Sequence, residues 1–153
     1  MKGVLELSKT FKGRVILGGN LRAEAVVTYQ GLNILASFQK SALKKAKQVI
    51  CSDQNNKHIY GLNLTNKIIC LPKTIGSTTG GMILQSVSKL GIGPSALLFS
   101  EHIDSLAAAG VILTDVWVEK RIITIDQLGE EFLDTVKTGQ MLEIKEDGTV
   151  IIE

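Results

Sequence analysis

Three hydroxyl side chains stand between glycines in residues 73–81, KTIGSTTGG, directly after the apolar run 67–72, KIICLP. An apolar run of this length bounded by turn residues is typical of a buried strand. Open α/β sheets bind ligands where such a strand ends and a helix begins. Unpaired N–H groups and the positive end of the helix dipole stabilise an anion there, and glycines let the anion approach the backbone. The stretch therefore predicts a site for a carboxylate or phosphate.

Two other roles for these hydroxyls stay open. Ser and Thr are preferred helix N-caps, so the stretch is also compatible with capping alone. One hydroxyl could instead carry a proton, provided that its surroundings stabilise the alkoxide. Two named motifs are excluded, because the Walker pattern needs Lys-Ser/Thr where the chain has Gly81-Met82, and the nucleophile elbow needs glycine where the chain has Ile75.

Few other groups could do acid–base chemistry. His58 belongs to the polar loop 52–58, SDQNNKH, where it could orient a substrate carboxylate or simply face solvent. Asp53 in the same loop is either a turn residue or a ligand. His102 is predicted in the first turn of a helix, with Ser100 as its cap. No Ser/His/Asp or paired-carboxylate arrangement follows from the spacing, so a complete active site is not visible.

The two cysteines do not predict a metal centre. Cys51 and Cys70 form no Cys-x-x-Cys motif and have no histidine at ligand spacing. Cys70 lies in an apolar run and is expected to be a buried thiol, whereas Cys51 could face a cleft. A chain with only two cysteines is typical of a reducing compartment.

The elements needed to position this stretch form two halves. The first half is predicted to be β-rich, with strands at 14–17, 23–29 and 32–38, a helix at 41–48 and a long loop at 52–58. The second half alternates strands at 67–71, 96–99 and 111–117 with helices at 82–90 and 103–109. A helix at 126–136 and a hairpin turning at Asp147-Gly148 close the chain. Near-continuous apolar strands that alternate with helices predict a parallel sheet with right-handed crossovers.

The fold class is therefore α/β, with a mixed or barrel-like β half and a βαβαβ half in one domain spanning residues 1–153. The 153 residues suffice for a real core, and 44% apolar with 21% charged residues is the profile of a folded protein. Lys and Arg outnumber Asp and Glu by only 17 to 15, which argues against a nucleic-acid or membrane partner. The basic run 40–47 is interpreted as a solvated face. No membrane span or signal-peptide core is visible, so a cytoplasmic location is expected.

Several motifs in order resemble the swivel domain, or small subunit, of the aconitase X family of dehydratases. The resemblance covers most of the chain and is strongest over about 70 residues. The matching segments are Ser37-Phe38, Ile50-Cys51-Ser52-Asp53 through His58-Ile59-Tyr60-Gly61, Ile69-Cys70-Leu71-Pro72, Gly76-Ser77-Thr78-Thr79-Gly80 and Gly91-Ile92-Gly93-Pro94-Ser95-Ala96.

The resemblance implies a heterodimeric hydro-lyase with a swivelling β/β/α domain. A large subunit would hold an iron–sulfur cluster or iron, and this chain would hold no metal. Ser77 would be the general base that removes a proton alpha to a carboxylate. Substrate contacts would come from Gly76, Thr78, Thr79, Gly80, Ser37, Asp53 and His58.

One departure bears on the substrate. Many family members, including archaeal mevalonate 5-phosphate dehydratases, carry arginine before the Gly-Ser pair, where this chain has Ile75. Phosphate favours bidentate charged donors, so the loss disfavours a phosphorylated substrate. The sequence is closer to the bacterial branch that dehydrates cis-3-hydroxy-L-proline to a pyrroline-2-carboxylate. The alternatives are a mevalonate 5-phosphate dehydratase subunit or a non-catalytic module that binds a small carboxylate.

Overall fold

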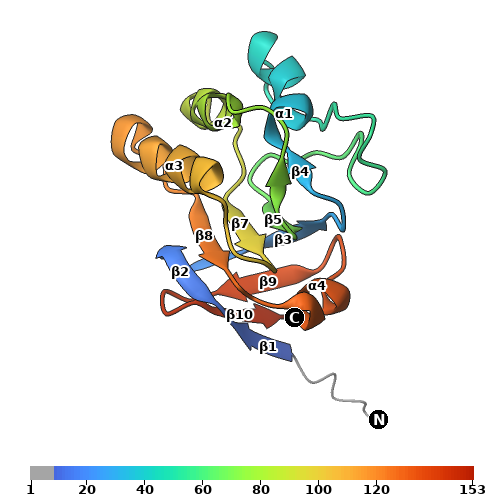
Figure 1. The fold of residues 1–153 in the computed structure, drawn as a ribbon, viewed down its shortest axis with the longest axis vertical. Coiled ribbons are helices and arrows are strands. Elements are labelled where there is room, and N and C mark those ends of the chain that lie inside the picture. Colours follow the sequence, from blue (N-terminus) through green and yellow to red (C-terminus); the bar gives the residue numbers. More distant parts are fainter. Residues whose placement is uncertain (1–8) are drawn as a thin grey trace.

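The computed structural model describes residues 9–153 (Figure 1). Its strands are β1 (Lys9–Lys12), β2 (Arg14–Leu17), β3 (Leu21–Val27), β4 (Leu32–Asn33), β5 (Ile68–Leu71), β6 (Thr74–Ile75), β7 (Ala96–Phe99), β8 (Ile123–Asp126), β9 (Met141–Ile144) and β10 (Thr149–Ile152). Its helices are α1 (Ile34–Leu43), α2 (Gly80–Lys89), α3 (Ser105–Leu113), a π-helical turn (Thr114–Val118) and α4 (Glu130–Thr135).

Eight strands form one mixed sheet in the order β1-β10-β9-β3-β5-β7-β8-β2. The two edge strands, β1 and β2, are consecutive in the chain and separated only by Gly13. One half of this bent segment pairs with β10 and the other half pairs with β8, both antiparallel. The two edges of the sheet are thereby joined, and the sheet is nearly closed into a barrel. Closure removes the unpaired edges that would otherwise invite aggregation.

The central strands β3, β5, β7 and β8 are parallel. Every residue of β5, β7 and β8 is buried, as expected for parallel strands covered on both faces. Successive side chains alternate between two cores. In β5, Ile68 and Cys70 pack inside the barrel, whereas Ile69 and Leu71 pack against the helices. Burying each such aliphatic side chain stabilises the fold by about 1.5–3 kcal/mol.

Helices α1, α2 and α3 lie together over one face of the parallel strands, and α4 lies near the opposite end of the molecule (Figure 1). Each of the three begins after the carboxyl end of a parallel strand: α1 follows β3, α2 follows β5 and α3 follows β7. The short parallel pair β4–β6 joins the first two of these connections by pairing Asn33 with Ile75. The arrangement confirms the predicted α/β class with a barrel-like part and a βαβαβ part, β5-α2-β7-α3-β8.

Two predicted strands are wrong. Residues 111–117 continue α3 into the π-helical turn, and the third parallel strand is β8, six residues farther on. The apolar run VIL fits a buried strand and a helix equally well. In the structure it belongs to α3, the helix that packs on α2. Residues 32–38 contain only two strand residues, because the Asn33 side chain caps α1 by accepting a hydrogen bond from the Ala36 N–H at 3.0 Å.

Smaller differences lie at the chain's end. The predicted hairpin at Asp147-Gly148 is confirmed and joins β9 to β10. The predicted helix 126–136 shrinks to α4, because its first residues belong to β8 and to the turn that follows. None of the helices in residues 9–153 is long and apolar enough to cross a bilayer.

Candidate functional site

Ser77 lies exposed at the point where the first turns of three helices meet. A small pocket there is lined by its loop and by the starts of α1, α2 and α3; the lining residues are Ile34, Thr74, Ile75, Gly76, Ser77, Thr78, Gly80, Gly81, Asp104, Leu106 and Ala107. The convergence depends on close backbone packing between α2 and α3, where a Cβ on Gly110 would stand 2.9 Å from the Gly81 Cα. The sequence prediction that the Gly-Ser stretch links a strand to a helix is confirmed.

The Ser77 hydroxyl is held by Thr79. The two hydroxyl oxygens lie 2.8 Å apart, and the Thr79 backbone N–H donates to Ser77 Oγ at 3.1 Å. Thr79 occupies the N-cap position of α2, yet its side chain makes no capping bond to the helix. The structure therefore does not support the simple capping interpretation for Thr79, and the first turn of α2 keeps its positive dipole end facing the pocket.

Gly76 gives the loop its shape. Its φ is +95°, a conformation that side chains with a Cβ rarely adopt, and a Cβ there would stand 2.5 Å from the Asn33 amide nitrogen. Because Asn33 caps α1, the tight approach of Gly76 fixes the Ser77 loop against the start of that helix. The glycine at position 76 is thus required by the close approach of the Asn33 side chain.

Asp104 lines the pocket but was not predicted from the sequence as a site residue. It caps α3 by accepting from the Ala107 N–H at 2.9 Å, and it accepts a hydrogen bond from the Thr74 hydroxyl. The helix therefore starts after Asp104, and His102 and Ser100 precede it, contrary to the prediction of a Ser100 cap. An Asp followed three residues later by the apolar stretch of α3 is the signal that could have found this cap.

The pocket beside Ser77 has a volume of only about 70 Å³. Sites that enclose a small molecule usually measure roughly 300–1,000 Å³. None of the described residues that line the pocket is Lys or Arg, and Asp104 contributes a carboxylate. The pocket is thus a partial site, with hydroxyls and a helix start on one side and an opening on the other.

Three predicted substrate contacts lie away from this pocket. Ser37 is fully buried in α1, and its hydroxyl has no hydrogen-bond partner among the described residues. Asp53 is buried in a turn, where its carboxylate accepts from the Asn55 N–H at 3.0 Å. His58 is exposed and stacks edge-on against Tyr29, with ring centroids 5.2 Å apart. None of the three lines the Ser77 pocket.

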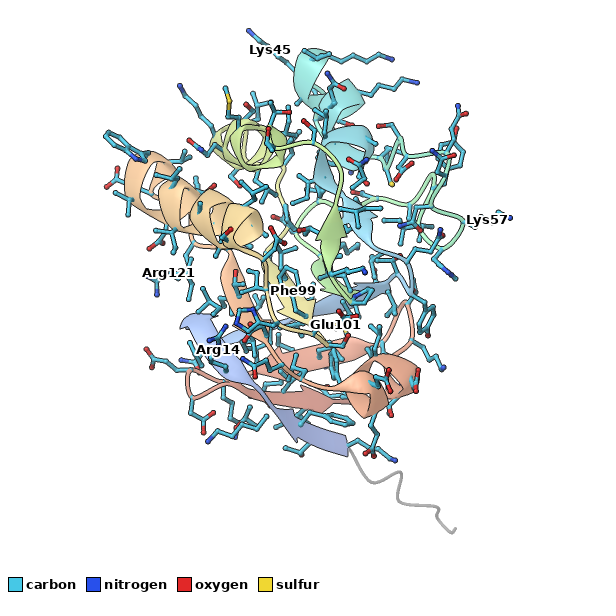
Figure 2. All side chains as sticks on the ribbon, viewed as in Figure 1. Arg14, Lys45, Lys57, Phe99, Glu101 and Arg121 are labelled. Carbon is cyan, nitrogen blue, oxygen red and sulfur yellow. The ribbon has the colours of Figure 1, made fainter. Side chains whose placement is uncertain are left out.

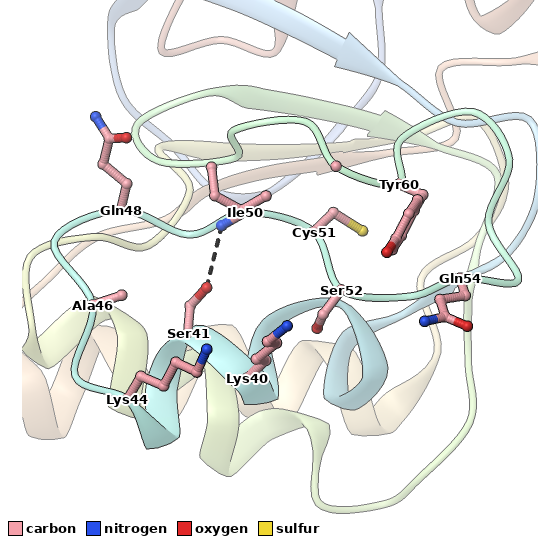
Figure 3. Close-up of a pocket in the computed structure, with 11 residues that line it drawn as sticks. Lys40, Ser41, Lys44, Ala46, Gln48, Ile50, Cys51, Ser52, Gln54 and Tyr60 are labelled. Atoms are coloured by element: carbon pink, nitrogen blue, oxygen red, sulfur yellow. Dashed lines mark hydrogen bonds between the residues drawn. The ribbon is translucent and has the colours of Figure 1, made fainter.

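A larger cavity of about 400 Å³ lies along the C-terminal half of α1 (Figure 3). Two of its hydroxyls hold the following loop on the helix: Ser41 Oγ accepts from the Ile50 N–H at 3.2 Å, and Ser52 donates to the Ala36 carbonyl at 2.6 Å. Lys40 and Lys44 line its rim and are exposed, as is Lys45, which projects outward in Figure 2. The basic run 40–47 is therefore a solvated face, as predicted, and this cavity contains none of the residues of the Gly-Ser stretch.

The cysteines are buried thiols. Burial is the main cause that raises the pKa of Cys51, and burial likewise raises the pKa of Cys70 far above its ordinary value. Cys51 lines the larger cavity, as the prediction of a cleft-facing residue allowed. Within residues 9–153, no three His, Cys, Asp or Glu side chains are close enough together to hold a metal ion.

An ion pair lies where β2 pairs with β8, at the carboxyl end of β8. Arg14 of β2 donates to both carboxylate oxygens of the buried Asp126, at 2.9 and 2.7 Å, and lies 3.3 Å from His102 Nε2. The Ile103 N–H donates to Asp126 at 2.8 Å. Burial alone would raise the pKa of Asp126, but these donors outweigh it and hold the pKa below its ordinary value.

Comparison with known proteins decides the family. A sequence model described as the aconitase X swivel domain matches residues 10–152. The chain belongs to the aconitase X swivel domain family. The family resemblance carried by the Gly-Ser stretch and its flanking motifs is thereby confirmed.

Relatives of this swivel domain include two that are named phosphomevalonate dehydratase small subunit. The protein of Thermococcus sibiricus is 29% identical over 143 residues, which cover 93% of this chain and 97% of the relative. The protein of Archaeoglobus fulgidus is 24% identical and covers 90% of this chain and 92% of the relative. The crystal structure of Thermococcus kodakaraensis aconitase X in its holo-form matches with a TM-score of 0.79 at 25% identity, over 95% of this chain and 98% of the matched chain.

Proposed function

We propose that this chain is the small subunit of a two-chain dehydratase of the aconitase X type, and that Ser77 is the general base. The observation that carries the proposal is the exposed Ser77 hydroxyl in a pocket of about 70 Å³ where three helices begin. A site this small needs a second chain to enclose a substrate. The small-subunit names of the relatives support the same division of the site between two chains.

The reaction would be the loss of water from a small hydroxy carboxylate. The Ser77 alkoxide takes the proton from the carbon alpha to the carboxylate, the electron pair forms a carbon–carbon double bond, and the hydroxyl leaves from the adjacent carbon. An iron–sulfur centre or iron in the large subunit would polarise that leaving hydroxyl. The Thr79 N–H and hydroxyl would donate to the alkoxide and lower the pKa of Ser77. Closure by the large subunit would exclude water and strengthen both bonds.

The substrate that the relatives' names favour is phosphomevalonate. A specific observation keeps cis-3-hydroxy-L-proline as the second candidate: Ile75, half-exposed at the pocket, stands where arginine is expected for a phosphorylated substrate. With Asp104 in the pocket and no cationic side chain among its described lining residues, the charge of a phosphate would have to be met by the large subunit.

The test is to co-express this chain with its large subunit, purify the complex and measure dehydration of both substrates. Turnover of phosphomevalonate with a kcat/KM at least about 100-fold above that for hydroxyproline would support the first substrate, a ratio of about 2.7 kcal/mol. The reverse ratio would select the second. A complex that dehydrates neither substrate, or a lone small chain that binds them tightly by calorimetry, would contradict the proposal.

A further inference from the structure

Resting on this proposed function, we infer that the large subunit docks on a continuous apolar surface formed by α2, α3 and the π-helical turn. We call it the α2–α3 surface. It consists of large apolar side chains that are all exposed; they are Met82, Leu106, Ile112, Leu113, Val116 and Trp117. Soluble chains rarely leave so many large apolar groups together on adjoining elements, and such patches mark interaction sites.

The side chains form a stripe because of their spacing. Leu106, Leu113 and Trp117 stand seven and four residues apart, which places them on one side of a helix. Met82 of α2 and Trp117 line the same groove, of about 460 Å³, between α2 and the π-helical turn. The close Gly81–Gly110 contact brings the two helices together, so their apolar side chains form one surface.

The surface is continuous with the Ser77 pocket. Leu106 belongs to both, since it lines the pocket and is about half-exposed. Met82 is in the first turn of α2, three residues after Thr79. A chain that covers Ser77 and completes its pocket would therefore also contact the α2–α3 surface. This continuity commits the surface to the large subunit as its occupant.

The surface also has the composition of an interface centre. Lys89 is the one charged residue among the described residues that line the groove, and nearby Asp115 is already paired, since it accepts from Arg121 at 3.0 and 2.8 Å. Interface cores are poor in charge and rich in Trp and Met. Trp117 is 74% exposed, although tryptophan is usually well covered in monomers.

The backbone that carries Trp117 is held in position before any partner arrives. Its π-helical turn is anchored by the buried Thr114 hydroxyl, which donates to the Gly110 carbonyl at 2.8 Å, and by Arg121, which also donates to the Gly18 carbonyl at 3.0 Å (Arg121 is labelled in Figure 2). π-helical turns occur frequently at functional sites. A tryptophan on an anchored backbone has only its side-chain torsions to fix on docking, which favours a binding hot spot.

The experiment compares Trp117→Ala with Leu43→Ala in the full-length chain. Leu43 on α1 is an ideal control because it is also 74% exposed but lies outside the α2–α3 surface. The affinity of each variant for the purified large subunit is measured by biolayer interferometry, with Val116→Lys as an independent second variant. Trp117→Ala should weaken binding about 30-fold or more, as hot-spot truncations do, and Leu43→Ala should leave the affinity within about twofold. Melting temperatures near that of the wild type confirm that the variants are folded.

A second readout uses the fact that Trp117 is the chain's single tryptophan. Labelled with 5-fluorotryptophan, it gives one ¹⁹F resonance, which should shift and broaden when unlabelled large subunit is added. Unchanged affinity of Trp117→Ala, or an unmoved resonance in a complex that forms, would overturn the inference while the proposed function stands. Dimerisation of the isolated chain through Trp117 would also overturn it. A wild-type chain that does not bind the large subunit at all would contradict the proposed function itself.

Discussion

The hydroxyl oxygens of Ser77 and Thr79 lie 2.8 Å apart at the uncapped start of α2. Thr79→Val removes this hydroxyl while keeping the shape of the side chain and the backbone N–H. In the complex with the large subunit, kcat should fall about 100-fold with little change in KM, because the lost donor acts on the charged oxygen that forms during reaction. Thr79→Ser should restore most of the rate. An unchanged kcat for Thr79→Val would remove Thr79 from a positioning role.

Gly76→Ala tests the loop's dependence on close packing. The added Cβ would combine an unfavourable φ of +95° with a clash 2.5 Å from the Asn33 side chain, and Asn33 could then no longer cap α1 as it does now. The matched control is Gly129→Ala, at the same φ of +95° but with nothing within 4 Å of the new Cβ. By chemical denaturation, the control should lose about 1–3 kcal/mol, because the Gly129 backbone lies in a region of φ and ψ that is essentially open only to glycine, and Gly76→Ala should lose more. Equal losses would mean that the contact with Asn33 is unimportant.

Gly110→Ala sets two effects of opposite sign against each other. Alanine is favoured over glycine inside a helix by about 1 kcal/mol. The new Cβ, however, would stand 2.9 Å from the Gly81 Cα, a backbone atom that no side-chain rotation can move aside. Overpacking of this kind costs about 1–3 kcal/mol and would push α3 away from α2 and the Ser77 pocket. We therefore expect a lower melting temperature and reduced turnover; a higher melting temperature would contradict the proposed packing.

Asp126 should make the fold sensitive to acid. Its pKa is lower in the folded chain than in the unfolded chain, so its contribution is complete above about pH 5 and is lost as the pH falls through its folded pKa. Asp126→Asn keeps the size but removes the charge beside Arg14 and His102, and should cost about 1–3 kcal/mol at pH 7. The free energy of unfolding of the variant should also fall less steeply than that of the wild type between about pH 5 and 3. Parallel pH curves would show that Asp126 is not the acid-sensitive group.

Elements with one strong local pattern could be predicted from the sequence, and elements with an ambiguous pattern could not. The fully apolar strands β5 and β7, the Gly-Ser turn between β5 and α2, and the Asp147-Gly148 hairpin have distinct signals. The run 111–117 does not, since an apolar segment fits a helix or a buried strand, and only packing against α2 selects the helix.

The same distinction holds for the site. The loop around Ser77 is contiguous in sequence, and its glycines and hydroxyls mark it. Asp104 reaches the pocket only because β7 pairs with β5, a contact that joins residues about 30 positions apart and leaves no local signal. Ser37 came from the family resemblance alone, and it faces the core from within α1. Asp53 and His58 are also candidates as polar residues of their loop, and their positions away from the pocket depend on how that loop folds back on α1.

The most direct test of the central claim is the turnover of the assembled complex that carries Ser77→Ala. Its subunits should associate with wild-type affinity, because among the described residues the Ser77 side chain hydrogen-bonds only to Thr79, within its own loop. With the proton acceptor gone, kcat should fall by about 10²- to 10⁴-fold on the substrate that the wild type prefers. A fully assembled Ser77→Ala complex with wild-type kcat would contradict the assignment of Ser77 as the base.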